Sequence, residues 1–188
     1  MIIIMMATDQ DIISQMKFSL EFDEKTRGPY LFQAIWIDTL LNQIISYYFC
    51  TTDLKKQGML IGLVLNEISF NSKIKYFLKI LELYPKMMVK YPKIETKLDN
   101  IRDFRNKIAH SKLDTSSEFL SKKKNYIRLS YYKNGKLMHY EISESIRKEK
   151  THEIVDVHYV LNDILNHISD GKFGNLIPMG NLDDKKSA

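Results

Sequence analysis

IETKLDNIRDFRNKIAH, residues 94–110, is the segment with the clearest structural pattern in this chain. Its apolar residues recur at every third or fourth position, as they do on the buried face of an amphipathic helix. They are Ile94, Leu98, Ile101, Phe104 and Ile108. Pro92 suits the first turn of such a helix, where a backbone N–H would have no partner. The pattern therefore predicts a helix that packs this stripe into a core and is oriented by it.

Three polar residues near the end of this predicted helix are the candidate catalytic residues: Arg105, Asn106 and His110. Asn106 and His110 are four residues apart and share a helical face, so the amide could orient an imidazole that titrates near neutral pH. Arg105 precedes His110 by five residues and lies about 140° around the axis. Only its long side chain could bring the guanidinium to the same ligand.

The spacing between this arginine and histidine does not by itself distinguish the site. Arg147 and His152 have the same spacing, but they lie in a charged segment without an apolar stripe and without an amide after the arginine. The sequence around Arg105 therefore singles it out, and the second pair is not expected to be functional.

Helical spacing of apolar residues predicts four further helices. The breaker TRGP at residues 26–29 should precede the first, and Pro85 should end the third. Thr51, Thr52 or Asp53 can cap the second, Ser69 precedes the third, and Thr151 is a plausible N-cap for the last. We expect helices over about residues 30–49, 54–65, 70–84 and 151–169. On the first, a polar stripe that includes Asp38 is either a water-facing edge or a wall of the active site.

The periodicity changes between the candidate site and the last predicted helix. Tyr126–Tyr132 and Lys136–Ile142 are rich in tyrosine and β-branched residues and flank Asn134-Gly135. This pair tolerates positive φ and favours a tight turn. We therefore predict a β-hairpin inserted within residues 122–150, a single domain over residues 1–170 and a flexible tail over residues 171–188.

Composition excludes several classes of protein. The chain has 188 residues, enough for one domain with a substantial core, and one cysteine, Cys50, which permits no intrachain disulfide and no thiolate metal cluster. No Walker loop, Gly-rich dinucleotide turn or His-Glu-x-x-His helix is present, so neither a metal nor a cofactor is predicted. No signal peptide or membrane span is recognised, and a cytoplasmic protein is expected.

Positive charge accumulates after the candidate site. Residues 112–150 contain ten basic and five acidic residues within a chain of net charge +5. Lys122, Lys123, Lys124 and Arg128 could attract a polyanion, although such runs also form ordinary solvated faces. Together with Asp38, Arg102 and Lys107, these four residues are the candidate contacts to nucleic acid.

The motif resembles that of the HEPN (higher eukaryotes and prokaryotes nucleotide-binding) superfamily of small helical domains. Arg105, Asn106 and His110 match its arginine, polar residue and histidine near a helix end. The pattern over residues 20–112 is similar to mannitol-operon repressor relatives in that superfamily. The matching upstream features are Glu21, Arg27-Gly28, the 34–41 segment with Asp38, and residues 70–74.

This resemblance implies a mainly α fold, an antiparallel bundle of four to five helices. It does not account for the β-hairpin predicted from the sequence at about residues 126–142, inserted before the last helix. It also implies a homodimer whose shared cleft cleaves RNA without a metal, as in toxin or phage-defence enzymes. His110 would be general base or acid, Arg105 would neutralise the phosphorane, and Asn106 would orient His110 or a phosphate oxygen. A nucleotidyltransferase-like antitoxin is the implied protein partner.

A non-catalytic reading of the same residues remains open. Arg105 could pair with an acidic neighbour or with Asp38, Asn106 could cap the helix, and His110 could sit favourably at its negative C-terminal end. The mannitol-repressor relatives are regulators, so the alternative that the resemblance implies is a non-catalytic dimeric regulatory or partner-binding protein.

Overall fold

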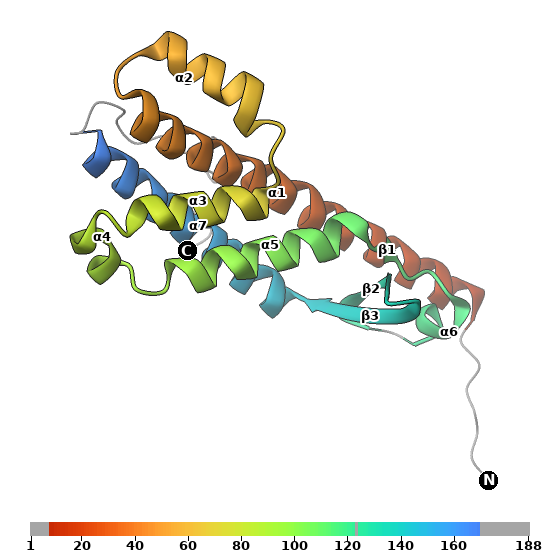
Figure 1. The fold of residues 1–188 in the computed structure, drawn as a ribbon. Helices are drawn as coiled ribbons and strands as arrows, with labels where there is room; N and C mark the ends of the chain where they lie inside the picture. Colours follow the sequence, from red (N-terminus) through yellow and green to blue (C-terminus); the bar gives the residue numbers. More distant parts are fainter. Residues whose placement is uncertain (1–7, 123, 170–188) are drawn as a thin grey trace. The chain divides into compact units, whose positions relative to one another are not determined.

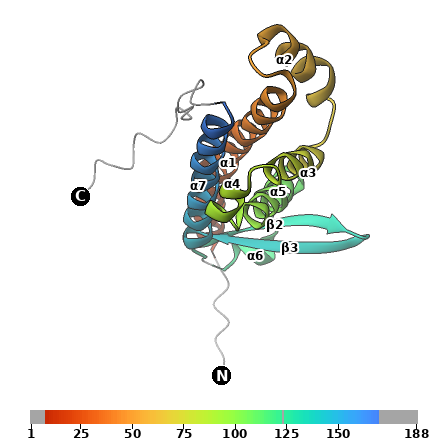
Figure 2. The same ribbon diagram turned by 60° about the vertical axis from the view of Figure 1, so that its left-hand side comes forward.

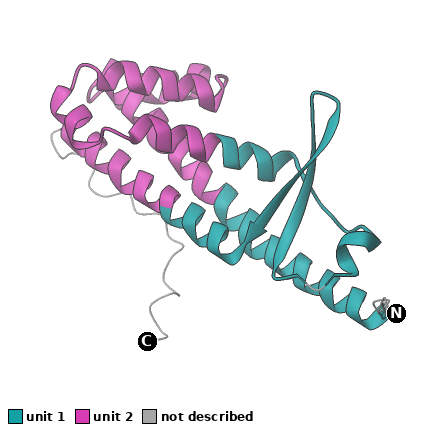
Figure 3. Ribbon diagram, turned by 90° about the horizontal axis from the view of Figure 1, so that it is seen from below, with its two compact units in different colours: residues 1–31, 103–152 teal, residues 32–102, 153–188 magenta. Residues whose placement is uncertain are grey.

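The computed structural model describes residues 8–122 and 124–169, and these form a mainly helical protein with one small antiparallel sheet (Figure 1). Internal contacts divide the chain into two compact units (Figure 3). Unit 1 comprises residues 1–31 and 103–152, and unit 2 comprises residues 32–102 and 153–188. Lys123 and the predicted tail lie outside the described residues. No described helix is both long and apolar enough to cross a membrane.

Unit 1 contains the sheet, whose strand order is β1-β2-β3 with β1 at Lys112–Leu113, β2 at Tyr126–Lys133 and β3 at Lys136–Ser143. Both pairings are antiparallel, and β2 and β3 lie side by side along their length (Figure 2). Asn134 and Gly135 form the turn with φ values of 52° and 74°. The predicted hairpin is therefore confirmed, and its turn uses the left-handed conformations that this pair tolerates.

The core of unit 1 lies between the inner face of this sheet and the helices. Ile127, Leu129 and Ile142 are buried on that face. Phe104 packs edge-on against Tyr30 and against Tyr140 of β3, with ring centroids 4.6 Å and 6.0 Å away. Phe104 belongs to the predicted stripe of α5 (Ile94–His110), and its burial fixes the end of α5 that carries the candidate site.

Unit 2 is helical and comprises parts of α1 (Asp9–Cys50), α5 and α7 (Glu144–Ile168) together with four shorter elements. These elements are α2 (Leu54–Leu60), the π-helical turn η1 (Ile61–Leu65), α3 (Phe70–Leu81) and α4 (Pro85–Lys90). Asp53 caps α2 through its side chain, as predicted, and Ser69 caps α3 in the same way. The apolar stripes of the predicted helices supply its core, which includes Ile37, Leu41, Phe77, Leu98, Leu161 and Ile164.

The predicted start of the first long helix was wrong, because α1 begins at Asp9 and continues through Gly28 and Pro29. Pro29 is exposed, so water can satisfy the Lys25 carbonyl that loses its helical donor. The buried residues of this region continue at helical spacing: Gln15, Ser19, Phe22, Thr26 and Tyr30. Gln15, Ser19 and Thr26 among them are polar. An apolar pattern could not reveal this face.

The predicted start of the last helix was also wrong, because α7 begins at Glu144 and Thr151 lies inside it. The Thr151 hydroxyl donates to the Arg147 carbonyl, which is a bond within the helix. Glu144 pairs with Arg147 at three-residue spacing, at 2.5 Å, and this stabilises the charged first turns as helix. The charged segment therefore extends α7 instead of forming a connection.

Three short elements were not predicted. Pro85 does not end α3, which stops at Leu81, but occupies the first turn of α4. A two-residue strand, β1, and a single helical turn, α6 (Ser117–Leu120), follow the candidate site. Ser116 caps α6 by accepting the Phe119 N–H. These segments are too short for an apolar period to be visible in sequence.

Candidate functional site

The candidate catalytic residues occupy the last turns of α5, in unit 1, and all three are exposed. Arg105 Nη1 donates to Asn106 Oδ1 over 3.1 Å, so the guanidinium and the amide are joined. The predicted contact between Asn106 and His110 is not present. Among the described residues, no hydrogen bond or ion pair engages the His110 side chain. Its imidazole is therefore accessible to a ligand.

Arg27 of α1 holds the end of α5 in place. Its Nη1 donates to the backbone carbonyls of Ile108, at 2.9 Å, and Ser111, at 2.8 Å. The same guanidinium donates to Asp23 Oδ1 from Nε and Nη2, at 3.2 Å and 3.0 Å. Carbonyls at a helix C-terminus have no intrahelical donor, and a cation there opposes the negative end of the helix dipole. His110 thus lies between two backbone positions that Arg27 fixes.

Arg27 was not predicted as a site residue, because TRGP was interpreted as a helix breaker. The four-residue spacing of Asp23 and Arg27 is the signal that could have indicated their pairing on one helical face. It could not have indicated the contact with α5, which joins residues 81 and 84 positions apart.

Lys107 lies against the sheet. Its Nζ is 4.8 Å from the ring centroid of Tyr140, within range of a cation–π interaction. Burial raises the pKa of the Tyr140 hydroxyl, so this ring remains neutral around pH 7. Lys107 remains close to the candidate catalytic residues on α5, but its ammonium already has an aromatic partner.

The solvent face of the sheet begins two residues after His110. Lys112, Ser130 and His139 are direct cross-strand neighbours and so share this face. The Ser130 hydroxyl lies 3.0 Å from His139 Nδ1, and Asp114 Oδ2 lies 3.9 Å from the same nitrogen. Ser130 and Asp114 both lie near the same ring nitrogen of His139. This is therefore not the Ser-His-Asp arrangement of hydrolases, in which the serine and the aspartate contact different ring nitrogens.

Arg128, predicted to contact nucleic acid, has structural partners. Its Nε donates to Asp114 Oδ2 over 2.7 Å, and its guanidinium lies 4.7 Å from the Phe119 ring centroid. Burial raises the pKa of Asp114, but hydrogen bonds from Ser116 and Arg128 outweigh it and leave the pKa lowered. Asp114 is therefore ionised at neutral pH, and the contacts of Arg128 with Asp114 and Phe119 attach α6 to the sheet.

The other predicted contacts to nucleic acid are divided between the two units. In unit 2, Asp38 accepts from the buried Lys73 at 2.6 Å, and Arg102 donates to Asn71 at 2.7 Å. In unit 1, Lys122 is exposed, and the backbone of Lys124 exchanges hydrogen bonds with the Gln15 side chain. Among the predicted nucleic-acid contacts in unit 1, Lys107 is therefore the one that lies on α5, the helix of the candidate site.

Within residues 8–122 and 124–169, no group of three or more His, Cys, Asp or Glu side chains could hold a metal ion. Cys50 is half-buried and forms no disulfide. Comparison of the chain with protein-family models, with curated proteins and with solved structures finds no match in any of the three.

Proposed function

We propose that this protein is a metal-independent endoribonuclease of the HEPN type, acting as a toxin or in phage defence. The observation that supports this most directly is the exposure of Arg105, Asn106 and His110 on turns of α5 whose end is fixed by Arg27. A histidine with no structural partner, beside an arginine and an amide, is suited to act on a bound phosphodiester. The HEPN arrangement of the helices is part of the same proposal.

The proposed reaction is transesterification within RNA. His110 accepts the proton of a ribose 2′-hydroxyl, and the oxygen attacks the adjacent phosphorus. Arg105 neutralises the charge that grows on the phosphorane oxygens, for which its planar, permanently charged group is well suited. Asn106, already joined to Arg105, positions that guanidinium or holds a phosphate oxygen. The 5′-oxygen leaves with a proton, and a 2′,3′-cyclic phosphate remains.

A second histidine is needed for this scheme, because one imidazole cannot accept and donate a proton in the same step. A homodimer that brings two copies of the site together supplies it. In a toxin, a nucleotidyltransferase-like antitoxin would be the partner that restrains cleavage.

Purified protein should cleave single-stranded RNA in the presence of EDTA and leave a cyclic phosphate. His110→Ala should abolish cleavage, whereas His152→Ala should not, because His152 is also exposed and follows Arg147 at the same spacing without belonging to the site. No cleavage by the wild type, or equal activity of the two variants, would contradict the proposal.

A non-catalytic regulatory or partner-binding function is the second candidate. The observation that favours it is a group of exposed apolar side chains on and next to α2 and η1: Phe49, Leu54, Met59, Leu63 and Val64. Exposed apolar side chains on neighbouring helical turns can form a protein-binding surface. A stable complex recovered from native cells, unaffected by His110→Ala but lost on Leu63→Lys, would favour this function over cleavage.

A further inference from the structure

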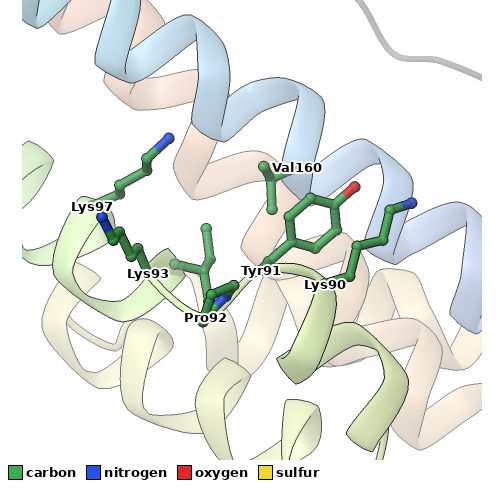
Figure 4. A pocket seen from close by; sticks show the side chains of 7 residues that line it. Lys90, Tyr91, Pro92, Lys93, Lys97 and Val160 are labelled. Atoms are coloured by element: carbon green, nitrogen blue, oxygen red, sulfur yellow. The ribbon is translucent and has the colours of Figure 1, made fainter.

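Unit 2 contains a small hollow where the connection between α4 and α5 meets α7 (Figure 4). Its volume is about 190 Å³. The floor is apolar and consists of Tyr91, Pro92, Ile94 and Val160. Three lysines also line the hollow, Lys90, Lys93 and Lys97, and the ammonium group of Lys90 lies on the far side of the Tyr91 ring from those of Lys93 and Lys97 (Figure 4). None of these residues belongs to the site proposed for RNA cleavage.

The charges around the hollow favour an anion. Lys90 pairs with Asp163 at 2.9 Å, and Lys97 pairs with Asp156 at 3.3 Å. Lys93 is exposed and has no ion-pair partner within the described part of the chain. Lys93 therefore carries a positive charge that no ion pair compensates within the described residues.

The two ion pairs do not prevent Lys90 and Lys97 from turning toward a ligand. The side chains of Lys90 and Asp163 are 54% and 42% exposed, and those of Lys97 and Asp156 are 34% and 62% exposed. Exposed pairs of this kind contribute little to stability. An anion in the hollow can therefore compete with Asp156 for the ammonium group of Lys97.

The apolar floor is held rigidly. The Tyr91 hydroxyl donates to Asp163 Oδ2 over 2.9 Å, and this bond orients the Tyr91 ring in the floor of the hollow. Ile94 is buried, and Val160 projects into the hollow from α7, across from the connection between α4 and α5. The hollow also adjoins the start of α5, where the helix dipole is positive. A preformed apolar surface thus lies beside cationic groups.

We propose that this hollow binds a small phosphate monoester, with the phosphate beside Lys93 and Lys97 and a compact apolar group against Tyr91 and Val160. Lysine ammonium groups bind phosphate as point charges. The volume is below the range of roughly 300–1,000 Å³ typical of sites for drug-sized ligands, so the organic part must be small. This inference is independent of the proposed nuclease function.

Phenyl phosphate, inorganic phosphate and phenol are suitable probes, titrated into the full chain by calorimetry and ¹H–¹⁵N NMR. We expect saturable binding of phenyl phosphate, with shifts concentrated at residues 90–97 and Val160. Inorganic phosphate should bind at the same residues more weakly, and phenol should not bind. Equal affinity for phenyl phosphate and inorganic phosphate contradicts the role of the floor, and shifts spread over lysines throughout the chain contradict the site.

Two lysine variants provide a matched test. Lys93→Ala should weaken the binding of phenyl phosphate about tenfold, as expected for loss of a charged hydrogen-bond donor. Lys55→Ala removes the same charge from an exposed position on α2, outside the hollow, and should leave the affinity unchanged. Equal effects of the two variants would show that only net charge attracts the anion and would overturn the proposal.

Discussion

At the scale of single residues, Arg27 links the folding of unit 1 to the geometry of the candidate site. Its guanidinium satisfies two backbone carbonyls at the end of α5 and is only 24% exposed. Replacing it removes donors from partly buried acceptors, which have no other donor in the helix. Its loss should therefore affect both stability and the position of His110.

We expect Arg27→Met to lower the free energy of unfolding by about 2 kcal/mol, since methionine keeps much of the packing but none of the hydrogen bonds. Chemical denaturation measures this change. Lys25→Met is the control, because Lys25 is exposed on the same turn of α1. Comparable stability of the two variants would contradict the capping role assigned to Arg27.

His158 should make the stability of unit 2 depend on pH. It is 3% exposed on α7, with Nε2 3.3 Å from the Gln33 carbonyl oxygen. Burial lowers the pKa of His158 below its ordinary value of 6.5, and the hydrogen bond to Gln33 only partly opposes this. The unfolded chain therefore takes up a proton at this histidine before the folded chain does, and stability falls as the pH drops below about 6.5.

We expect His158→Gln to reduce the loss of stability between pH 7.5 and pH 5.5, measured by urea denaturation at each pH. Glutamine keeps an N–H donor for Gln33 but does not titrate. Asp114 and Asp163, whose pKa values are lowered, destabilise the fold only at more acidic pH and do not contribute in this interval. A wild-type pH dependence that His158→Gln leaves unchanged would exclude His158 as its source.

The sequence predicted which residues of the candidate site are exposed on one helix, but not their partners. The stripe from Ile94 to Ile108 oriented α5 correctly, because it depends on contacts local to one helix face. The contacts of Arg27 and Arg128 join residues far apart in the chain and depend on tertiary packing. Sequence spacing could not have predicted that Arg128 pairs with Asp114 and is not free to bind RNA.

At the scale of elements, α1 shows why local signals failed. Gly28 and Pro29 both disfavour a helix interior, and the expected break at these residues follows from propensity alone. The face that α1 buries in unit 1 includes polar residues, with Thr26 donating to the Phe22 carbonyl and Gln15 bound to the backbone of Lys124. Tertiary contacts therefore outweigh two unfavourable residues. The hairpin was predictable because its turn is determined locally by Asn134 and Gly135.

Gly28→Ala tests the continuity of α1. A Cβ at this position meets no atom within 4 Å, and glycine in a helix costs about 1 kcal/mol relative to alanine. We expect the variant to be more stable by about that amount in chemical denaturation. Gly135→Ala should instead destabilise the fold, because Gly135 has a φ of 74°. No gain from Gly28→Ala would favour a break at Gly28-Pro29.

At the scale of the whole molecule, the proposed chemistry requires two chains, and this can be tested by mixing them. In a shared site that needs both His110 side chains, a dimer with one His110→Ala chain is inactive. When wild-type and variant chains exchange freely in equal amounts, random pairing leaves about one quarter of the dimers fully wild-type. Cleavage should then fall to about one quarter of that of the same total protein as wild type, whereas two independent sites would retain about one half. A linear dependence on the wild-type fraction would show that each chain acts alone.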